Sequence, residues 1–105
     1  MSSERDAVAT VRERRPSFRQ FQKRQKALGR LGASCYSLLK ARERGASAEY
    51  IDECEYMIRY DETGCTYVGV SQEMVEDTKG FILEVLPGLP AELREAAIRA
   101  KRLEV

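Results

Sequence analysis

The chain has 105 residues, 43% of them hydrophobic and 33% charged, and its formal net charge is +1. This length predicts one domain over residues 1–105, and the composition excludes a disordered chain of low hydrophobicity and high net charge. The sequence contains no histidine, which excludes Ser-His and Cys-His nucleophile pairs and removes the commonest metal ligand. We therefore expect a protein that is not an enzyme and that holds no cofactor and no metal.

The three cysteines, Cys35, Cys54 and Cys65, are an odd number and widely spaced, which favours unpaired thiols in a reducing compartment. No apolar run approaches the roughly 18 residues that a membrane span needs. Residues 1–15 are charged throughout, so we expect no secretory signal there. These features predict a soluble, cytoplasmic protein that does not contact a membrane.

The chain begins with a charged segment, residues 1–16, which we expect to form a separate short helix or a flexible arm because Pro16 breaks the chain after it. Ser17 can cap the next helix, which runs to about Arg44 and stops at Gly45. The apolar residues of this long helix fall on one stripe at helical spacing; apart from Phe18 near its edge they are Phe21, Leu28, Leu31, Cys35, Leu38 and Leu39.

Three further helices follow. Ser47 can cap a helix over 48–62, closed by Gly64, and Ser71 can cap one that runs to about Leu86. Between them, residues 65–70 (CTYVGV) are β-branched and aromatic, and we expect a short extended connection. A last helix is expected over 90–104, with Leu93 facing inward. The sequence thus predicts an all-α bundle of four or five helices, with one long basic N-terminal helix.

Charge is distributed unevenly along the chain. Residues 1–44 hold 12 basic and 4 acidic residues, whereas residues 45–86 hold 2 basic and 10 acidic residues. Such an asymmetry indicates either a charged partner or pairing between the two segments.

Four cations of the long helix, Arg19, Lys23, Lys26 and Arg30, lie on one side of it, opposite the apolar stripe. Over about 16 Å of helix they form a line of positive charge suited to a phosphate backbone. Arg12, Arg14 and Arg15 precede them across the proline. We therefore expect these seven residues to bind nucleic acid, DNA or RNA. A solvated face, or neutralisation by the acidic helix 48–62, are the alternatives.

A second candidate surface lies on helix 48–62, where Tyr56 and Tyr60 fall on the outer face beside Glu49 and Glu53. Exposed aromatic residues next to acids indicate a protein-binding patch. The same pattern also suits a second packing face in the bundle or a homodimer interface.

Paired carboxylates are the one feature that favours an enzyme. Two predicted helices carry carboxylates at the same spacing, Glu49, Asp52 and Glu53 on one and Glu73, Glu76 and Asp77 on the other. This spacing is loosely similar to the ExxE and ExxD pairs of all-α nucleotide pyrophosphohydrolases, and that resemblance implies Mg²⁺ held between the two helices. Asp52 and Glu76, however, point away from the apolar faces of their helices, whereas a metal site in a bundle core needs them inward.

The leading interpretation is a small, non-enzymatic binding or regulatory protein that associates with nucleic acid through the basic helix. The alternative is an interaction or inhibitor module for an acidic or nucleic-acid-mimicking protein surface, as in an accessory protein of a mobile element. A magnesium-dependent pyrophosphohydrolase-like enzyme ranks third.

Overall fold

The computed structural model describes residues 17–101, and every regular element in that range is helical. This confirms the predicted all-α class for the described residues, whereas the expected short helix or arm over 1–16 lies outside them. The four α-helices are α2 (Phe18–Glu43), α3 (Ala48–Tyr67), α4 (Gln72–Gly80) and α5 (Ala91–Ala100). A π-helical turn, η1 (Phe81–Val85), and a 3-10 turn, η2 (Leu86–Gly88), continue α4.

Each of the first three helices starts at a serine. The hydroxyl of Ser17 accepts a hydrogen bond from the backbone N–H of Gln20 at 3.1 Å, and Ser47 and Ser71 do the same three residues ahead at 3.2 Å. These bonds satisfy N–H groups that have no partner within the helix. The three serine caps predicted from the sequence are therefore confirmed.

Helices α2 and α3 end in the same motif. At the end of α2 the N–H of Ala46 donates to the carbonyl of Ala41 at 2.9 Å, across Gly45 with φ 67°. At the end of α3 the N–H of Val70 donates to the carbonyl of Cys65 at 2.9 Å. Both are Schellman motifs, which need a left-handed residue after the helix, and glycine adopts that conformation at little cost.

The second motif corrects the sequence-based boundary. The prediction that the helix closes at Gly64 and that residues 65–70 are extended is wrong, because α3 continues to Tyr67 and turns at Gly69, with φ 87°. Cys65 is fully buried on the face that also carries Cys54 and Ile58. Its burial in a helical register outweighs the β-propensity of the segment, since propensity is a weak prior against packing.

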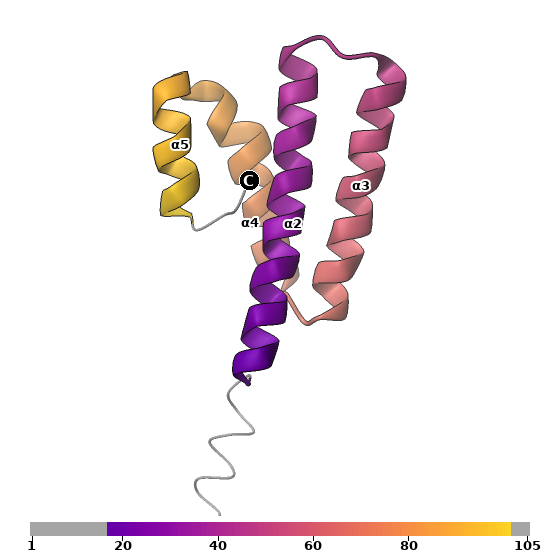
Figure 1. Cartoon of the computed structure of the whole chain (residues 1–105), viewed down its shortest axis with the longest axis vertical. Helices are drawn as coiled ribbons and strands as arrows, with labels where there is room; N and C mark the ends of the chain where they lie inside the picture. Colours follow the sequence, from indigo (N-terminus) through magenta and orange to yellow (C-terminus); the bar gives the residue numbers. More distant parts are fainter. Residues whose placement is uncertain (1–16, 102–105) are drawn as a thin grey trace, which may run out of the picture.

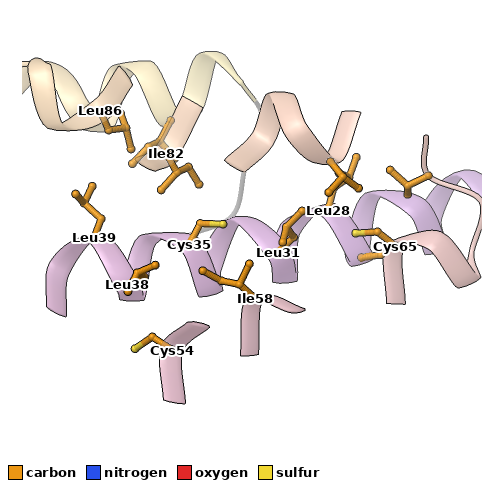
Figure 2. Packing of buried hydrophobic residues seen from close by; sticks show 14 of the residues in the cluster. Leu28, Leu31, Cys35, Leu38, Leu39, Cys54, Ile58, Cys65, Ile82 and Leu86 are labelled. Atoms are coloured by element: carbon orange, nitrogen blue, oxygen red, sulfur yellow. The ribbon is translucent and has the colours of Figure 1, made fainter. Parts of the chain in front are cut away.

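The helices pack around α2. Figure 1 shows α2 and α3 side by side and antiparallel, with α4 against another side of α2 and α5 beyond α4. In Figure 2, Leu39 of α2 points toward Leu86, whereas Leu38 lies on the side that faces Cys54 and Ile58 of α3. Two sides of α2 are therefore buried, which accounts for its wide apolar stripe.

Some expected core positions face solvent. Val75, Ile82 and Leu86 are buried as predicted, but Met74 and Val85 are about half exposed. The π-turn of η1 changes the helical phase within this segment, so an inner face drawn for a regular α-helix misplaces Val85. In α5 the buried residue is Ile98, and the inward position expected for Leu93 is wrong because Leu93 is half exposed.

An ion pair connects helix α5 to the end of α2. Two guanidinium nitrogens of Arg94 donate to the two carboxylate oxygens of Glu43, at 2.8 and 2.7 Å. The ammonium of Lys101 also lies 5.3 Å from the centre of the Phe81 ring. A bidentate pair of this kind fixes orientation as well as distance.

Within residues 17–101, none of the helices combines the length and the apolar character needed to cross a membrane.

Candidate nucleic-acid interface

The four cations predicted to form a basic stripe all lie on the N-terminal half of α2. Arg19, Lys23, Lys26 and Arg30 are exposed, and we call them the basic face. The N-terminal end of α2, indigo in Figure 1, projects past the end of α3. Phe21, expected on the buried stripe, is half exposed for the same reason: less protein packs around this end of the helix.

No acidic side chain within residues 17–101 forms an ion pair with the basic face at 4.0 Å or less. The pairs in that range use other cations: Arg42 with Glu55, Lys79 with Glu62 and Glu76, and Arg94 with Glu43. Because α3 runs antiparallel to α2, its acidic first half lies beside the other end of α2 (Figure 1). No acidic side chain of the described residues therefore neutralises the basic face through an ion pair.

A groove of about 450 Å³ runs between α2 and α3 on this side of the molecule. Lys23, Lys26 and Arg30 line its α2 wall, and Tyr60 and Tyr67 line its α3 wall. Its other lining residues are Ala27, Asp61, Thr63, Gly64 and Val68. Most of the surface of the groove is apolar, and the charge is concentrated on one wall.

A second hollow of about 340 Å³ extends this groove toward the start of α2. Lys23, Tyr67 and Val68 line both hollows, and Gln20 and Arg24 belong to the second one alone. The two together form a track beside the basic face.

Arg24 differs from the cations around it, because its side chain contacts the turn after α3. Its Nε donates a hydrogen bond to the backbone carbonyl of Val68 at 3.1 Å. A Cβ built at Gly69 would lie 3.0 Å from its guanidinium. Arg24 thus fixes the turn after α3 against α2, and so fixes the position of Tyr67 beside Lys23.

Asp61 is the one buried carboxylate among the described residues. Its side chain accepts a hydrogen bond from the hydroxyl of Ser34, and it lines the α3 side of the groove. A buried carboxylate with a hydrogen-bond donor is tolerated where an unpaired one is not. The groove is therefore positive along α2 and negative at one point on α3.

The residues predicted to form a protein-binding patch are all exposed on α3, at successive spacings of 4, 3 and 4 residues. Tyr60 lines the groove with the basic residues, whereas Glu53 lines a different hollow with Tyr50 and Met57. Tyr56 is exposed and lines neither hollow, and Glu49 is exposed near the start of α3. The four residues lie on one side of α3, with Tyr60 also bordering the groove, and the protein-binding patch stays a prediction.

Tyr67 is a groove residue that the sequence does not single out, because the β-propensity of residues 65–70 favours an extended connection there. A signal for it exists in the sequence. The short turn between two long helices predicts an antiparallel pair, and counting outward from that turn places Tyr60 and Tyr67 opposite residues 24–31 of α2.

The remaining candidates do not form a site in the described residues. Within 17–101, no three acidic, cysteine or histidine side chains lie close enough together to hold a metal. All three cysteines are buried and unpaired, and burial raises the pKa of Cys35 to about 12. Arg12, Arg14 and Arg15 lie outside the described residues.

Comparison with protein-family models, with curated proteins and with solved structures finds no match to the chain.

Proposed function

We propose that the protein binds nucleic acid through the basic face of α2 and does not catalyse a reaction. The observation that carries this proposal is that four exposed cations have no acidic partner among the described residues. Arg19, Lys23, Lys26 and Arg30 share one side of one rigid helix, and no acidic residue of the described chain pairs with them. Binding of a polyanion to such a face is driven by the release of its counterions.

The groove beside the basic face supports the same proposal. A charged face that serves only solubility needs no shaped surface next to it. Here Lys23, Lys26 and Arg30 border an apolar hollow with two exposed aromatic rings. Positive charge interleaved with aromatic residues is typical of surfaces that bind nucleic acid.

The test is a titration of labelled oligonucleotides, single-stranded and duplex DNA and RNA, at several salt concentrations. The variant to compare with the wild type carries Lys23→Gln, Lys26→Gln and Arg30→Gln, which keep the side-chain stems and the helix propensity. Three lost phosphate contacts reduce the salt slope by about 2 units on a single strand. At 0.1 M salt this corresponds to about 100-fold weaker binding.

A charge-matched control is available on the same helix. Lys40→Gln, Arg42→Gln and Arg44→Gln remove three cations from the C-terminal end of α2 and from its C-cap, away from the groove. We expect this variant to bind like the wild type. A wild-type protein that binds no nucleic acid at low salt contradicts the proposal, and equal losses in both variants show that net charge alone is responsible.

One observation favours a second candidate, an interaction module for another protein. Outside the groove, Tyr56 is 61% exposed, and Tyr50 and Met57 are also exposed on α3. Exposed aromatic and methionine side chains are enriched at protein interfaces. If this surface carries the function, Tyr56→Ala will abolish capture of a protein partner, and neutralising the basic face will leave that capture unchanged.

A further inference from the structure

We infer that the ligand of the groove is a single-stranded nucleic acid, whose bases stack on Tyr60 and Tyr67 while its phosphates contact Lys23, Lys26 and Arg30. The inference rests on the proposed function and adds the strandedness of the ligand. It follows from the composition of the two walls: one supplies cations, and the other supplies aromatic rings.

The two tyrosines are placed to receive bases. Tyr60 is 65% exposed and Tyr67 is 90% exposed, yet both line the same groove. Neither hydroxyl is engaged in a hydrogen bond with another described side chain that would fix the ring against the protein surface. Each ring therefore offers its aromatic face to a ligand, and base stacking needs such a face.

The charges set the orientation of the strand. The α2 wall carries three cations, whereas the only charged group on the α3 side of the groove is Asp61. Phosphates are attracted to the first wall and repelled from the second. The backbone is thus expected to follow α2, with its bases turned across the groove toward α3.

The lengths of the two walls agree with this arrangement. Lys23 and Arg30 are seven residues apart, as are Tyr60 and Tyr67, and seven residues of helix span about 10 Å. Inside a duplex the phosphates of one strand are about 3.4 Å apart along the axis, so about three of them cover that distance, and a single strand with unstacked bases is more extended and covers it with no more. A short single strand therefore reaches both tyrosines while it stays in contact with the three cations.

A duplex cannot use the second wall. Its bases are stacked inside the helix and present only their edges in the grooves, so the rings of Tyr60 and Tyr67 have no base face to meet. A duplex would contact the cations alone. The structure thus predicts tighter binding of a single strand than of a duplex with the same number of accessible phosphates.

The experiment compares three ligands with the same number of phosphates at one salt concentration: oligo(dT), a dA·dT duplex of half that length and an abasic oligonucleotide that keeps only sugar and phosphate. We expect the order of affinity to be oligo(dT), then duplex and abasic strand. For oligo(dT), Tyr60→Ala and Tyr67→Ala should each weaken binding about 5- to 150-fold, as measured for stacked bases elsewhere. Neither change should affect the abasic strand.

Two controls separate stacking from folding. Tyr56→Ala removes an equally exposed tyrosine from the same helix outside the groove, so binding should not change. Tyr60→Phe and Tyr67→Phe keep the rings and should restore wild-type affinity. Because the chain has no tryptophan and five tyrosines, its intrinsic emission reports tyrosine directly, and stacking should quench it with oligo(dT) but not with the abasic strand.

The possible failures are distinguishable. No binding of any of the three ligands at low salt overturns the proposed function. Equal affinity for all three ligands, with no effect of Tyr60→Ala or Tyr67→Ala, leaves the charge-based function standing and overturns the single-strand inference alone.

Discussion

The two halves of α2 use their positive charge in different ways. In the C-terminal half, Arg42 pairs with Glu55 at 3.9 Å, and Lys40 lies over the ring of Tyr36 at 4.9 Å. Arg44, the C-cap of this helix, lies over the ring of Tyr50 at 4.8 Å. In the N-terminal half, the basic face has no such partner within residues 17–101. One helix thus carries charge that contacts other side chains of the fold at one end, and charge without such a partner among the described residues at the other.

The C-terminal half of α2 is also more tightly packed than the N-terminal half. Leu38 and Leu39 are buried between α3 and the α4–η2 segment (Figure 2), whereas Phe18 and Phe21 at the other end are exposed. A surface that leaves both cations and aromatic rings in solvent gains little stability from them. The comparison indicates that the C-terminal half of α2 carries most of the buried residues of this helix, and the binding surface that we propose lies on the other half.

The largest expected effect is therefore on stability, from Leu38→Ala. Leu38 is 2% exposed, and truncating a buried leucine costs about 2–5 kcal/mol through lost transfer energy and the cavity left behind. Phe18→Ala is the matched change in the other half. Phe18 is 74% exposed, so its loss should stay within about 0.5 kcal/mol.

Urea unfolding followed by circular dichroism measures both variants. Similar losses for Leu38→Ala and Phe18→Ala would remove the distinction between a packed half and an open half.

The packed half is the part that the sequence predicts well. The apolar stripe, the serine caps and Gly45 locate α2 almost to the residue, because these are local signals with a direct physical cause. The end of α3 is missed because Cys65–Tyr67 has β-propensity, and only the packing of Cys65 shows that the segment is helical.

The groove depends on contacts between residues far apart in the chain, and so the sequence gives only its parts. Lys23, Lys26 and Arg30 are found as a stripe, but Tyr60 is grouped with the acids of its own helix. What joins Tyr60 to the cations is the antiparallel pairing of α2 with α3. A helical wheel describes one helix at a time and contains no information about that pairing.

The two Schellman glycines allow a smaller and sharper comparison, since one lies at each end of α3. Gly45→Ala and Gly69→Ala both place an L-residue in the left-handed region, at a cost of about 1–2 kcal/mol. At Gly69 the new methyl group also approaches the guanidinium of Arg24, whereas nothing lies near Gly45.

We expect Gly69→Ala to lose more stability than Gly45→Ala, and only Gly69→Ala should also weaken oligonucleotide binding, because it displaces the Arg24 contact that positions Tyr67. Unfolding curves and binding titrations test the two effects separately. Weakened binding in Gly45→Ala would show that the effect is not specific to the groove.

Neutralising the charges of the packed half should have a modest effect on stability. The control variant Lys40→Gln, Arg42→Gln, Arg44→Gln loses one ion pair and two cation–π contacts, and these partly exposed interactions together stabilise the fold by about 1 kcal/mol. Lys23→Gln, Lys26→Gln, Arg30→Gln loses no ion pair of the described residues, so its melting temperature should not fall. A fall equal to that of the control would show that the basic face is paired in solution.

The smallest effect is the pH dependence of the Glu43–Arg94 pair, which attaches α5 to the packed half. Hydrogen bonds from Arg94 hold the pKa of Glu43 below its ordinary value. A carboxyl group whose pKa is lowered on folding binds protons more readily in the unfolded chain, so its contribution to stability is complete at neutral pH. That contribution is lost as the pH falls from about 4.3 through the lower pKa of the folded protein.

Glu43→Gln lacks the charge at every pH. The wild type should therefore be more stable than this variant at pH 7, and the difference should shrink as the pH falls through the lowered pKa of Glu43, in urea unfolding and in the amide exchange of α5. A stability difference that does not shrink as the pH falls would mean that packing of Ile98, and not the ion pair, holds α5 in place.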